Sequence, residues 1–378
     1  MNVPGLRFKD DGGEFPAWAS KQIGQVLTIG SGKDYKHLSK GDIPVYGTGG
    51  YMLSVDSFLY DGESVCIGRK GTIDKPTLLT GKFWTVDTLF YTHSFKNCLP
   101  KFVYAIFQKV DWKNYNEASG VPSLSKSTIE KIEVSVPSIQ EQTKIANFLT
   151  AVDEKIQHLT QKADLLAQYK KGVMQQIFSQ ELRFKDDDKS EFPAWEMAKL
   201  SEIAQIVGGG TPDTSVTEYW QGEIQWFTPT ELKTKYIGKS VRAITQNGLS
   251  NSSAKKLPAG TLLFSSRATV GEISIALNEC TTNQGFQSFI VNEFNNNEFI
   301  YYWILNNKNS FIEKASGSTF LEISKKEIEK LTIKRPSYSE QTKIANFLSA
   351  IDDKITHAQT QLAAVKQYKQ GLLQQMFV

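Results

Sequence analysis

The stretch EQTKIANFL occurs twice in this chain, at residues 141–149 and again at residues 340–348. Aligning residues 141–178 with residues 340–377 gives 21 identities in 38 positions at a constant offset of 199. A match of this length at a fixed offset indicates an internal duplication. The segments around each copy should therefore show why one chain needs the same element at two places.

Apolar residues in both copies recur at alternating steps of four and three. The stripe is interrupted once in each copy, where Lys170 and Lys369 take an apolar position. A period of 3.5 residues held over several heptads is typical of a coiled coil. We predict two long helices that pair with each other; the alternative is that each stripe packs only on its own globular region.

A second repeat lies outside these helices. The head segment LRFKDDGGEFPAW at 6–18 returns as LRFKDDDKSEFPAW at 182–195, directly after the first helix. The repeating unit is therefore a head segment, a globular region and a long helix. If a pseudo-twofold axis relates the two units, the helices are antiparallel and the chain begins near the end of the second helix. This is a circular arrangement.

The two globular regions differ in sequence but follow one plan. Each has a strand-rich middle punctuated by glycine, a helical pattern at 100–110 or 297–307, and a short helix-to-strand passage that ends in Pro137 or Pro336. We predict an α+β fold with two similar strand-rich domains joined by two long antiparallel helices. The predicted bounds are 1–140 and 181–339 for the domains, and 141–180 and 340–378 for the helices.

Composition narrows the class of protein. The chain has 378 residues, 40% of them apolar, which fits a globular protein with more than one core. It begins without the basic-then-apolar order of a signal peptide, and its longest apolar run is the seven residues at 299–305, so we expect a cytoplasmic protein with no membrane partner. Cys66, Cys98 and Cys280 form no C-x-x-C pair, which argues against a zinc knuckle or a disulfide framework.

The distribution of charged residues along the chain says more about possible partners than the net charge does. The formal net charge is only +3, but no acidic residue occurs between Leu232 and Gly271, where seven are basic. Such a window is either a solvated face or a surface for an anionic partner.

No catalytic motif stands in a suitable context. The tetrapeptides N-P-P-Y and D-P-P-Y of adenine methyltransferases are absent, and the glycine-rich stretches at 46–51 and 208–212 lack the strand-loop-helix setting of phosphate loops. Asp213, Glu231 and Lys233 match the P-D…E-x-K pattern of metal-dependent nucleases, but in a turn-like context. We expect no catalytic residue, no metal and no enzyme activity in this chain, with the nuclease pattern as an alternative.

The two predicted helices begin with the similar segments PSIQEQTKIANFL and PSYSEQTKIANFL, which share the pattern P-x-x-x-E-Q-x-x-I-A. With the duplicated helices and two dissimilar globular regions, the chain resembles the specificity subunit of type I restriction-modification systems over essentially its whole length. The resemblance implies two target-recognition domains, each reading one half of a split site in double-stranded DNA. It also implies that the helices set the spacing and dock two methyltransferase subunits.

Further expectations follow from this resemblance. S-adenosylmethionine would belong to the methyltransferase subunits, which methylate adenine, so this chain would hold no cofactor of its own. Motor-nuclease subunits would join for restriction. An alternative from another class is a scaffold with two protein-binding modules on a coiled coil and no nucleic acid.

Candidate site residues fall into two groups. For partner docking we predict polar residues at the start of each helix, with helix capping or local packing as the alternative: Glu141, Gln142, Lys144 and Asn147, and Glu340, Gln341, Lys343 and Asn346. For DNA, we align GRKGTI with SSRATV and take Arg69 and Arg267, at an offset of 198, as corresponding residues. Arginine forks onto guanine O6 and N7, and small neighbours let a loop approach DNA closely.

The remaining candidates for DNA contact are loop and basic residues. The loop residues are Gly47, Thr48, Gly49, Lys70, Thr228, Thr230, Thr282, Asn283 and Gln284. Phosphate contacts, which position a protein on DNA without specifying a sequence, are assigned to Lys233, Lys235, Lys239, Lys255 and Lys256.

Overall fold

A computed structural model describes residues 4–10, 13–317 and 320–377. The chain forms two compact units: unit 1 comprises the residues up to Lys162 together with those from Ala358 onward, and unit 2 comprises Ala163–His357. Each unit thus contains one globular region and a part of each long helix. The four-domain division made from the sequence stays a prediction.

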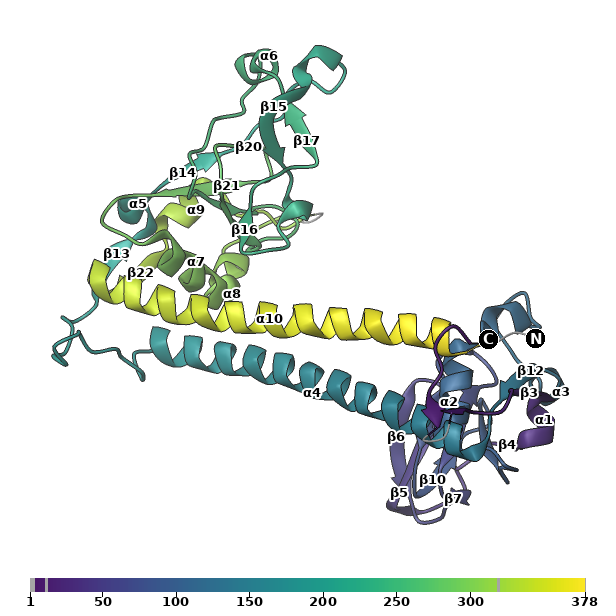
Figure 1. Ribbon diagram of the computed structural model, residues 1–378. Coiled ribbons are helices and arrows are strands. Elements are labelled where there is room, and N and C mark those ends of the chain that lie inside the picture. The colour runs from purple at the N-terminus through teal and green to yellow at the C-terminus, as the bar shows by residue number, and fades with distance from the viewer. Residues whose placement is uncertain (1–3, 11–12, 318–319, 378) are drawn as a thin grey trace. The chain divides into compact units, whose positions relative to one another are not determined.

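The two long helices are α4 (Ile139–Phe178) and α10 (Tyr338–Met376). Within each unit they run antiparallel (Figure 1). Low numbers on one helix meet high numbers on the other, since Lys369 binds Asp153 in unit 1 and Lys170 binds Asp352 in unit 2. Both Nζ to Oδ1 distances are 2.6 Å. The two lysines that interrupt the apolar stripe therefore form ion pairs across the helix pair.

Unit 1 is built from short strands, with helix α2 packed against strands β8 and β9. Its strands and helices are β1 (Lys9–Asp10), β2 (Gly13–Glu14), β3 (Ala19–Gln22), α1 (Ile23–Val26), β4 (Thr28–Ser31), β5 (Lys40–Gly47), β6 (Gly50–Val55), β7 (Tyr60–Asp61), β8 (Ser64–Gly68), β9 (Thr77–Leu79), β10 (Lys82–Thr85), β11 (Leu89–His93), α2 (Pro100–Lys109), α3 (Lys126–Glu130) and β12 (Glu133–Val136). Two four-stranded sheets, ordered β6-β5-β10-β7 and β4-β11-β8-β9, form its body.

Unit 2 repeats this plan. Its strands and helices are β13 (Glu196–Lys199), α5 (Leu200–Ile203), β14 (Ala204–Gly208), β15 (Trp220–Phe227), β16 (Tyr236–Ile237), β17 (Arg242–Ile244), α6 (Gln246–Ser250), β18 (Leu262–Phe264), β19 (Ile273–Ala276), β20 (Thr281–Thr282), β21 (Gln287–Val291), α7 (Asn297–Asn306), α8 (Lys308–Glu313), α9 (Lys325–Lys330) and β22 (Thr332–Arg335). Its two larger sheets are ordered β14-β21-β18-β19-β16 and β17-β15-β20, and β13 pairs with β22.

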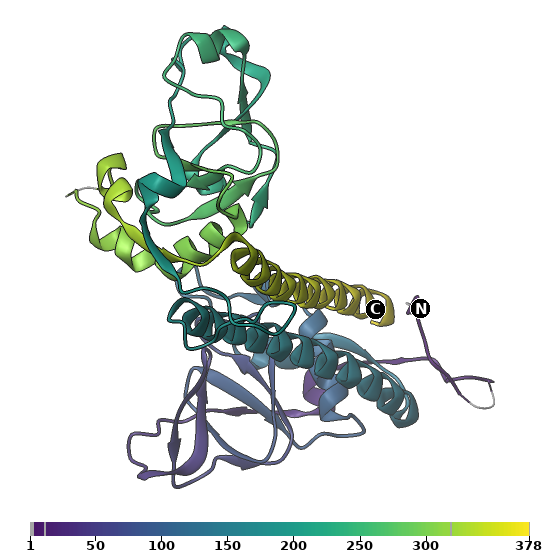
Figure 2. The same cartoon turned by 90° about the vertical axis from the view of Figure 1, so that its left-hand side faces the viewer.

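The helices predicted at 100–110 and 297–307 are confirmed as α2 and α7. In unit 2, α7 and α8 lie between the strands and helix α10, as the views in Figures 1 and 2 agree. Phe299, Ile304 and Phe311 of this layer are fully buried in one core with Ile344 and Leu348 of α10. The core of each unit is thus closed by its own stretch of the long helices.

The apolar stripes pack as the sequence predicts. In unit 1, Ile145 and Leu149 of α4 share a core with Leu372 and Met376 of α10. In unit 2, Ile177 shares a core with Ile351. The helices therefore pack both on each other and on the globular region of their own unit, which combines the two alternatives left open by the sequence.

The head segments show how the chain closes on itself. The Leu182 amide, just beyond α4, donates to the Gln176 carbonyl at 3.0 Å, and the Leu6 amide donates to the Gln375 carbonyl of α10 at the same distance. Leu6 of the first head segment therefore lies against the end of α10 as Leu182 of the second lies against the end of α4. This confirms the circular arrangement inferred from the repeat.

Candidate nucleic-acid interface

Corresponding loops meet at one end of the strands in each unit, and each is held by backbone hydrogen bonds. In unit 1, the Arg69 and Lys70 amides donate to the Thr88 carbonyl at 2.8 and 3.3 Å. The β5–β6 turn lies beside this loop, because a Cβ placed on Gly68 would lie 3.2 Å from Cγ2 of Thr48. The structure therefore brings Gly47, Thr48 and Gly49 together with Arg69 and Lys70, both of which are exposed.

The loops of unit 2 gather in the same way. The Asn283 amide donates to the Phe227 carbonyl at 3.0 Å, which joins the ends of β20 and β15. The Ser266 amide donates to the Gly285 carbonyl at 2.9 Å, and Gln284 is hydrogen-bonded to Thr211. Four loops at 209–211, 228–230, 266–268 and 283–285 thus form one cluster, the unit 2 loop cluster.

The hydrogen bonds correct our alignment of the two arginines. Lys70 is bridged to Ser123 in unit 1 as Arg267 is bridged to Glu322 in unit 2. The Gly71 amide bonds the Pro122 carbonyl as the Ala268 amide bonds the Leu321 carbonyl. Arg267 and Ala268 each lie 197 residues after their counterparts, whereas the partners Glu322 and Leu321 lie 199 residues after theirs. The counterpart of Arg267 is therefore Lys70, and Arg69 corresponds to the buried Ser266.

Backbone conformation supports this register. Gly71 has a φ of 88° and Ala268 a φ of 61°, so both loops turn through the left-handed region at the same point. The side chain just before this turn, Lys70 or Arg267, is exposed in each unit. Arg267 lies 3.6 Å from Glu322, an exposed ion pair that contributes little to stability.

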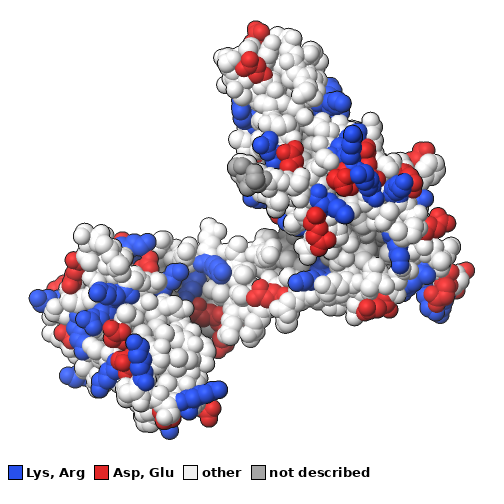
Figure 3. Space-filling view, turned by 180° about the vertical axis from the view of Figure 1, so that it is seen from behind, with Lys and Arg blue, Asp and Glu red and all other residues white. Residues whose placement is uncertain are grey.

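Most of the lysines assigned to phosphates are accessible, but one is not. Lys233, Lys239, Lys255 and Lys256 are exposed, and Lys256 pairs with the exposed Glu279. Lys255 follows the segment 253–254, which packs against Gly210 of the unit 2 loop cluster. On the face shown in Figure 3, basic side chains are interspersed with acidic ones rather than forming a single positive field.

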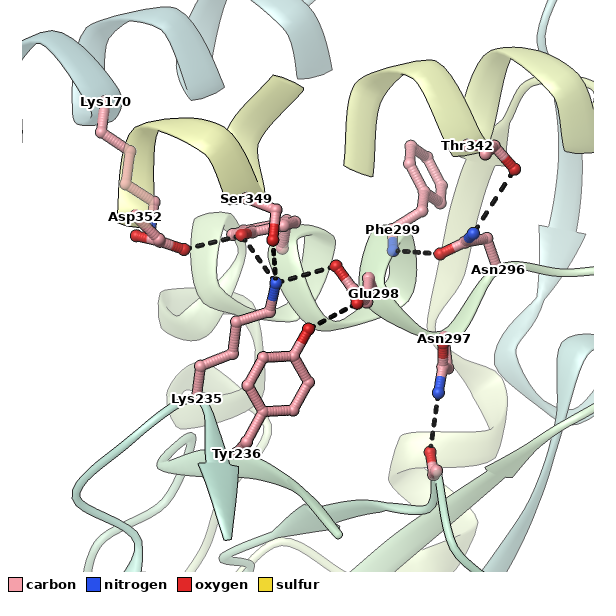
Figure 4. Close-up of polar contacts among 12 residues, drawn as sticks. Lys170, Lys235, Tyr236, Asn296, Asn297, Glu298, Phe299, Thr342, Ser349 and Asp352 are labelled. Atoms are coloured by element: carbon pink, nitrogen blue, oxygen red, sulfur yellow. Dashed lines mark hydrogen bonds and ion pairs between the residues drawn. The ribbon is translucent and has the colours of Figure 1, made fainter. Parts of the chain in front are cut away.

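Lys235 is wrongly assigned to phosphate contact. Its Nζ atom lies 2.8 Å from Glu298 Oε2, 2.8 Å from Ser349 Oγ and 3.0 Å from the Tyr302 hydroxyl (Figure 4). The side chain is only 12% exposed. It points toward helices α7 and α10, because Glu298 and Tyr302 lie on α7 and Ser349 lies on α10. It therefore holds the start of β16 to these two helices instead of facing DNA.

This polar network extends across the helix pair of unit 2. The Tyr302 hydroxyl donates to Asp352 Oδ2 at 2.6 Å, and Asp352 Oδ1 binds Lys170 (Figure 4). Burial by itself would raise the pKa of Glu298, but hydrogen bonds from Lys235 and Tyr236 outweigh burial and hold that pKa below its ordinary value. Glu298 is therefore an anion that stabilises its two partners.

Thr282 is a second correction. It is 1% exposed in β20, and its hydroxyl finds no hydrogen-bond partner among the described residues. A residue buried behind the loop cannot contact DNA. Asn283 and Gln284, which follow it, are half-buried and exposed, and Thr228 and Thr230 are half-buried and exposed on the neighbouring loop. These four remain predictions as DNA contacts.

The glutamates at the starts of α4 and α10 bind the head segments and are not exposed to a partner. Glu141 is fully buried, and Arg7 donates to both of its carboxylate oxygens at 3.0 and 2.7 Å. In unit 2, Arg183 donates to both oxygens of the buried Glu340 at 3.3 and 2.8 Å. The repeated head supplies the arginine for the repeated helix, a pairing that the joint duplication of the two segments could have indicated.

The glutamines that follow also form hydrogen bonds within their own units. Gln142 is buried, donates to the Pro137 carbonyl at 2.9 Å and accepts from the Leu99 amide at 2.9 Å. Gln341 donates to the Pro336 carbonyl at 3.0 Å and accepts from the Asn296 amide at 2.8 Å. Docking of a partner by Glu141, Gln142, Glu340 and Gln341 is thus wrong, because these side chains pack locally.

The other four candidates for docking divide into two pairs. Lys144 donates to the Lys9 carbonyl at 2.9 Å, and Lys343 donates to the Lys185 carbonyl at 3.0 Å, so both lysines also bind the head segments. Asn147 and Asn346 are exposed at corresponding positions of α4 and α10. Of the eight candidates for docking, these two asparagines are the ones whose side chains are exposed to a partner.

The residues of the nuclease pattern have structural roles. Glu231 accepts from the Thr228 amide at 2.7 Å and from the Val241 amide at 2.7 Å, and Asp213 accepts from the Ser215 amide and hydroxyl. Both carboxylates thus organise turns. Within the described part of the chain, no group of three or more His, Cys, Asp or Glu is arranged to hold a metal ion.

A family of known proteins shares this sequence and arrangement. The model of the type I restriction modification DNA specificity domain matches residues 17–168 and again residues 194–367, one copy in each repeat. The chain belongs to this family. In the described residues no helix is both long and apolar enough to cross a membrane.

Relatives in the family match over different shares of the chain. The specificity subunit of the type I restriction enzyme MjaIX of Methanocaldococcus jannaschii is 35% identical over 207 residues, which cover 53% of this chain and 48% of that protein. The specificity subunit of EcoR124I/EcoR124II of Escherichia coli is 25% identical over 237 residues, covering 61% and 57%. This chain spans about half the length of these curated relatives.

Solved structures show that the fold is shared over the full length. The type I restriction-modification S subunit from M. genitalium superposes with a TM-score of 0.68 at 15% identity and covers 100% of this chain and 99% of that one. A chain from a type I restriction-modification system studied for its complex assembly gives 0.57 at 16% identity, covering 95% and 97%. The predicted fold class is therefore confirmed.

Proposed function

We propose that this chain is the DNA-recognition subunit of a type I restriction-modification complex and that each unit reads one half of a bipartite site. The observation that carries the proposal is the common register of the two units. One backbone arrangement, at an offset of 197, presents Lys70 in unit 1 and Arg267 in unit 2. The two units thus share a backbone arrangement but carry different side chains on their exposed loops. Because side chains read the identity of bases, this difference suits the units to two different half-sites.

The chain acts in this proposal without catalysis of its own. Adenine methylation belongs to two methyltransferase subunits that carry S-adenosylmethionine, and restriction belongs to additional motor-nuclease subunits. The match to the DNA specificity family in both halves supports this assignment. The duplicated helices, with Asn147 and Asn346 exposed at corresponding positions, offer two equivalent surfaces for two copies of one partner.

A copurification experiment tests the proposal. The full chain is expressed with its neighbouring gene products, and the purified complex and the isolated chain are each incubated with DNA and S-adenosylmethionine. We expect methylation by the complex but not by the isolated chain, and sequencing of methylated sites should give two short motifs separated by an unspecified gap.

Other outcomes identify the other classes of protein. Magnesium-dependent cleavage of DNA by the isolated chain would favour the nuclease pattern. A complex that forms but neither binds nor methylates DNA would favour a protein-interaction scaffold. A methylated motif without a gap would contradict the assignment of one half-site to each unit.

A further inference from the structure

Arg242 lies on a rigid aromatic platform in unit 2. It begins β17 opposite Trp226 of β15, and its guanidinium carbon lies 3.5 Å from the centre of the Trp220 ring and 5.5 Å from that of Trp226. The two indoles meet edge to face with their centres 5.0 Å apart, and both are almost fully buried. Their N–H groups donate to the carbonyls of Asp213 and Gly210 at 3.1 and 2.9 Å, which fixes both rings.

The guanidinium on this platform has unused hydrogen-bonding capacity. Arg242 is exposed, and within the described ranges 4–10, 13–317 and 320–377 its guanidinium forms neither a hydrogen bond nor an ion pair. A guanidinium carries five N–H donors in a planar fork, and stacking on an aromatic face holds that plane in place. The fork is therefore oriented before any ligand arrives, which lowers the entropy cost of a planar contact.

Strand directions place Arg242 beside the unit 2 loop cluster. β15 and β20 are parallel, so Thr228 and Asn283 follow these strands at the same edge of the sheet. β17 is antiparallel to β15, so its first residue, Arg242, lies at that edge as well. Glu231 links the loop after β15 to the start of β17, because it accepts hydrogen bonds from the Thr228 and Val241 amides.

The other unit provides an internal comparison. The β5–β6 pair of unit 1 is antiparallel like β15–β17, and in each pair a register shift leaves two residues of the first strand facing a single partner, Val55 or Ile244. Three consecutive pairs then follow in the same order in both units, although β5–β6 has a second shift after Val45. In this register Leu53 corresponds to Arg242 and Val45 to Trp226. Unit 1 therefore has an aliphatic, half-buried side chain where unit 2 has a stacked arginine.

This difference separates two kinds of DNA contact. The phosphate backbone is the same at both half-sites, so positions that bind phosphate are expected to agree between two copies of one domain. Bases differ between half-sites, so a position that differs at the same backbone register is suited to reading bases. We infer that Arg242 is a further specificity-determining residue, which reads a guanine in the half-site of unit 2 through its planar fork. The inference rests on the proposed function.

Two substitutions distinguish a base contact from a phosphate contact. Arg242→Gln removes the charge and the fork, whereas Arg242→Lys keeps the charge without the planar fork. Lys326→Ala, which removes an exposed charge on α9 outside the loop cluster, is the matched control. Each variant is copurified with the methyltransferase subunit, its melting temperature is measured, and its methylated sites are sequenced.

We expect both Arg242 variants to accept other bases at one guanine position of a single half-site, with an about 10- to 100-fold loss of discrimination there. The control should keep the wild-type motif and melting temperature. Both Arg242 variants should stay folded in the methylation assay, because the Trp220 and Trp226 rings keep their own hydrogen bonds. Restoration of full specificity by Arg242→Lys, with uniform weakening across sequences in Arg242→Gln, would show a phosphate contact and overturn the inference.

The design separates this inference from the proposed function. A wild-type complex with a bipartite motif that both Arg242 variants leave intact would overturn the inference alone. A change in the half-site that also responds to Lys70→Ala would place Arg242 in the wrong unit and overturn it as well. A wild-type complex without any sequence preference would overturn the proposed function and the inference with it.

Discussion

At the scale of single residues, the exposed side chain before the left-handed turn distinguishes the two units. It is Lys70 in unit 1 and Arg267 in unit 2, at one backbone register. We expect Lys70→Ala and Arg267→Ala to relax specificity in different halves of the site, each costing about 1–3 kcal/mol of discrimination. Sequencing of methylated sites measures this, and two variants that altered the same half would contradict the two-reader model.

A lysine outside these turns should behave differently. Lys255 is exposed beside the loop cluster, and a phosphate contact there would contribute to binding of every sequence alike. Lys255→Ala therefore serves as the comparison for the turn variants: the motif should stay the same while the dependence of affinity on salt becomes weaker.

The two tryptophans of the head segments form a natural matched pair. Trp195 donates its indole N–H to the buried Glu340 at 3.1 Å, whereas the corresponding Trp18 indole N–H is buried without a partner among the described residues. A hydrogen bond to a charged group contributes about 1.5–3 kcal/mol, and removing an unpaired N–H sacrifices none. Trp195→Phe should therefore lower the free energy of unfolding by about 1–2 kcal/mol more than Trp18→Phe in urea denaturation. Equal losses would show that Glu340 does not depend on Trp195.

At the scale of elements, the network around Lys235 joins β16, α7 and α10 in unit 2. The folded-state pKa of Glu298 is lower than its ordinary value of 4.5 because Lys235 and Tyr236 bind the anion against the opposing effect of burial. A carboxyl with a lowered folded pKa contributes stability above its unfolded pKa, and this contribution is lost as the pH falls through the folded pKa. Unit 2 should therefore lose this stabilisation below about pH 4.5.

Lys235→Met tests this pair at the same scale. The substitution leaves Glu298 without its cation, so the free energy of unfolding near pH 7 should fall by about 1.5–3 kcal/mol, the contribution of a hydrogen bond to a charged group. The same variant should lose less stability than the wild type between pH 5 and 3, because Glu298 no longer gains from being ionised. Urea denaturation across that range gives both quantities, and parallel pH curves for variant and wild type would contradict the assigned role.

At the scale of the whole molecule, α4 and α10 each run continuously from one unit into the other, with the boundaries at Lys162/Ala163 and His357/Ala358. If the helices set the gap between half-sites, four alanines inserted at both boundaries lengthen each helix by about 6 Å. The gap should then grow by about two base pairs at roughly 3.4 Å each, while the bases of both half-sites stay the same. An active variant with an unchanged gap, seen in its list of methylated sites, would show that the helices do not fix the distance.

The chain sequence by itself determined the elements and their duplication. A 3.5-residue period, a nine-residue identity and a repeated head are local patterns, so they predicted two long helices, two similar domains and the circular connection. The interruptions at Lys170 and Lys369 were visible as well. Their role in ion pairing was not visible, because Asp352 and Asp153, which pair with them, lie 182 and 216 residues away along the chain.

Only the tertiary structure decided which polar side chains face outward. Glu141, Lys235 and Thr282 have the residue types of a binding surface, yet each is turned inward or covered by segments distant in sequence. Arg242 was one basic residue among seven until strand pairing placed it over Trp220 and beside the loop cluster. Hydropathy periods record which face of an element is apolar, but the partner of a polar group depends on how elements pack, and that is set by the whole chain.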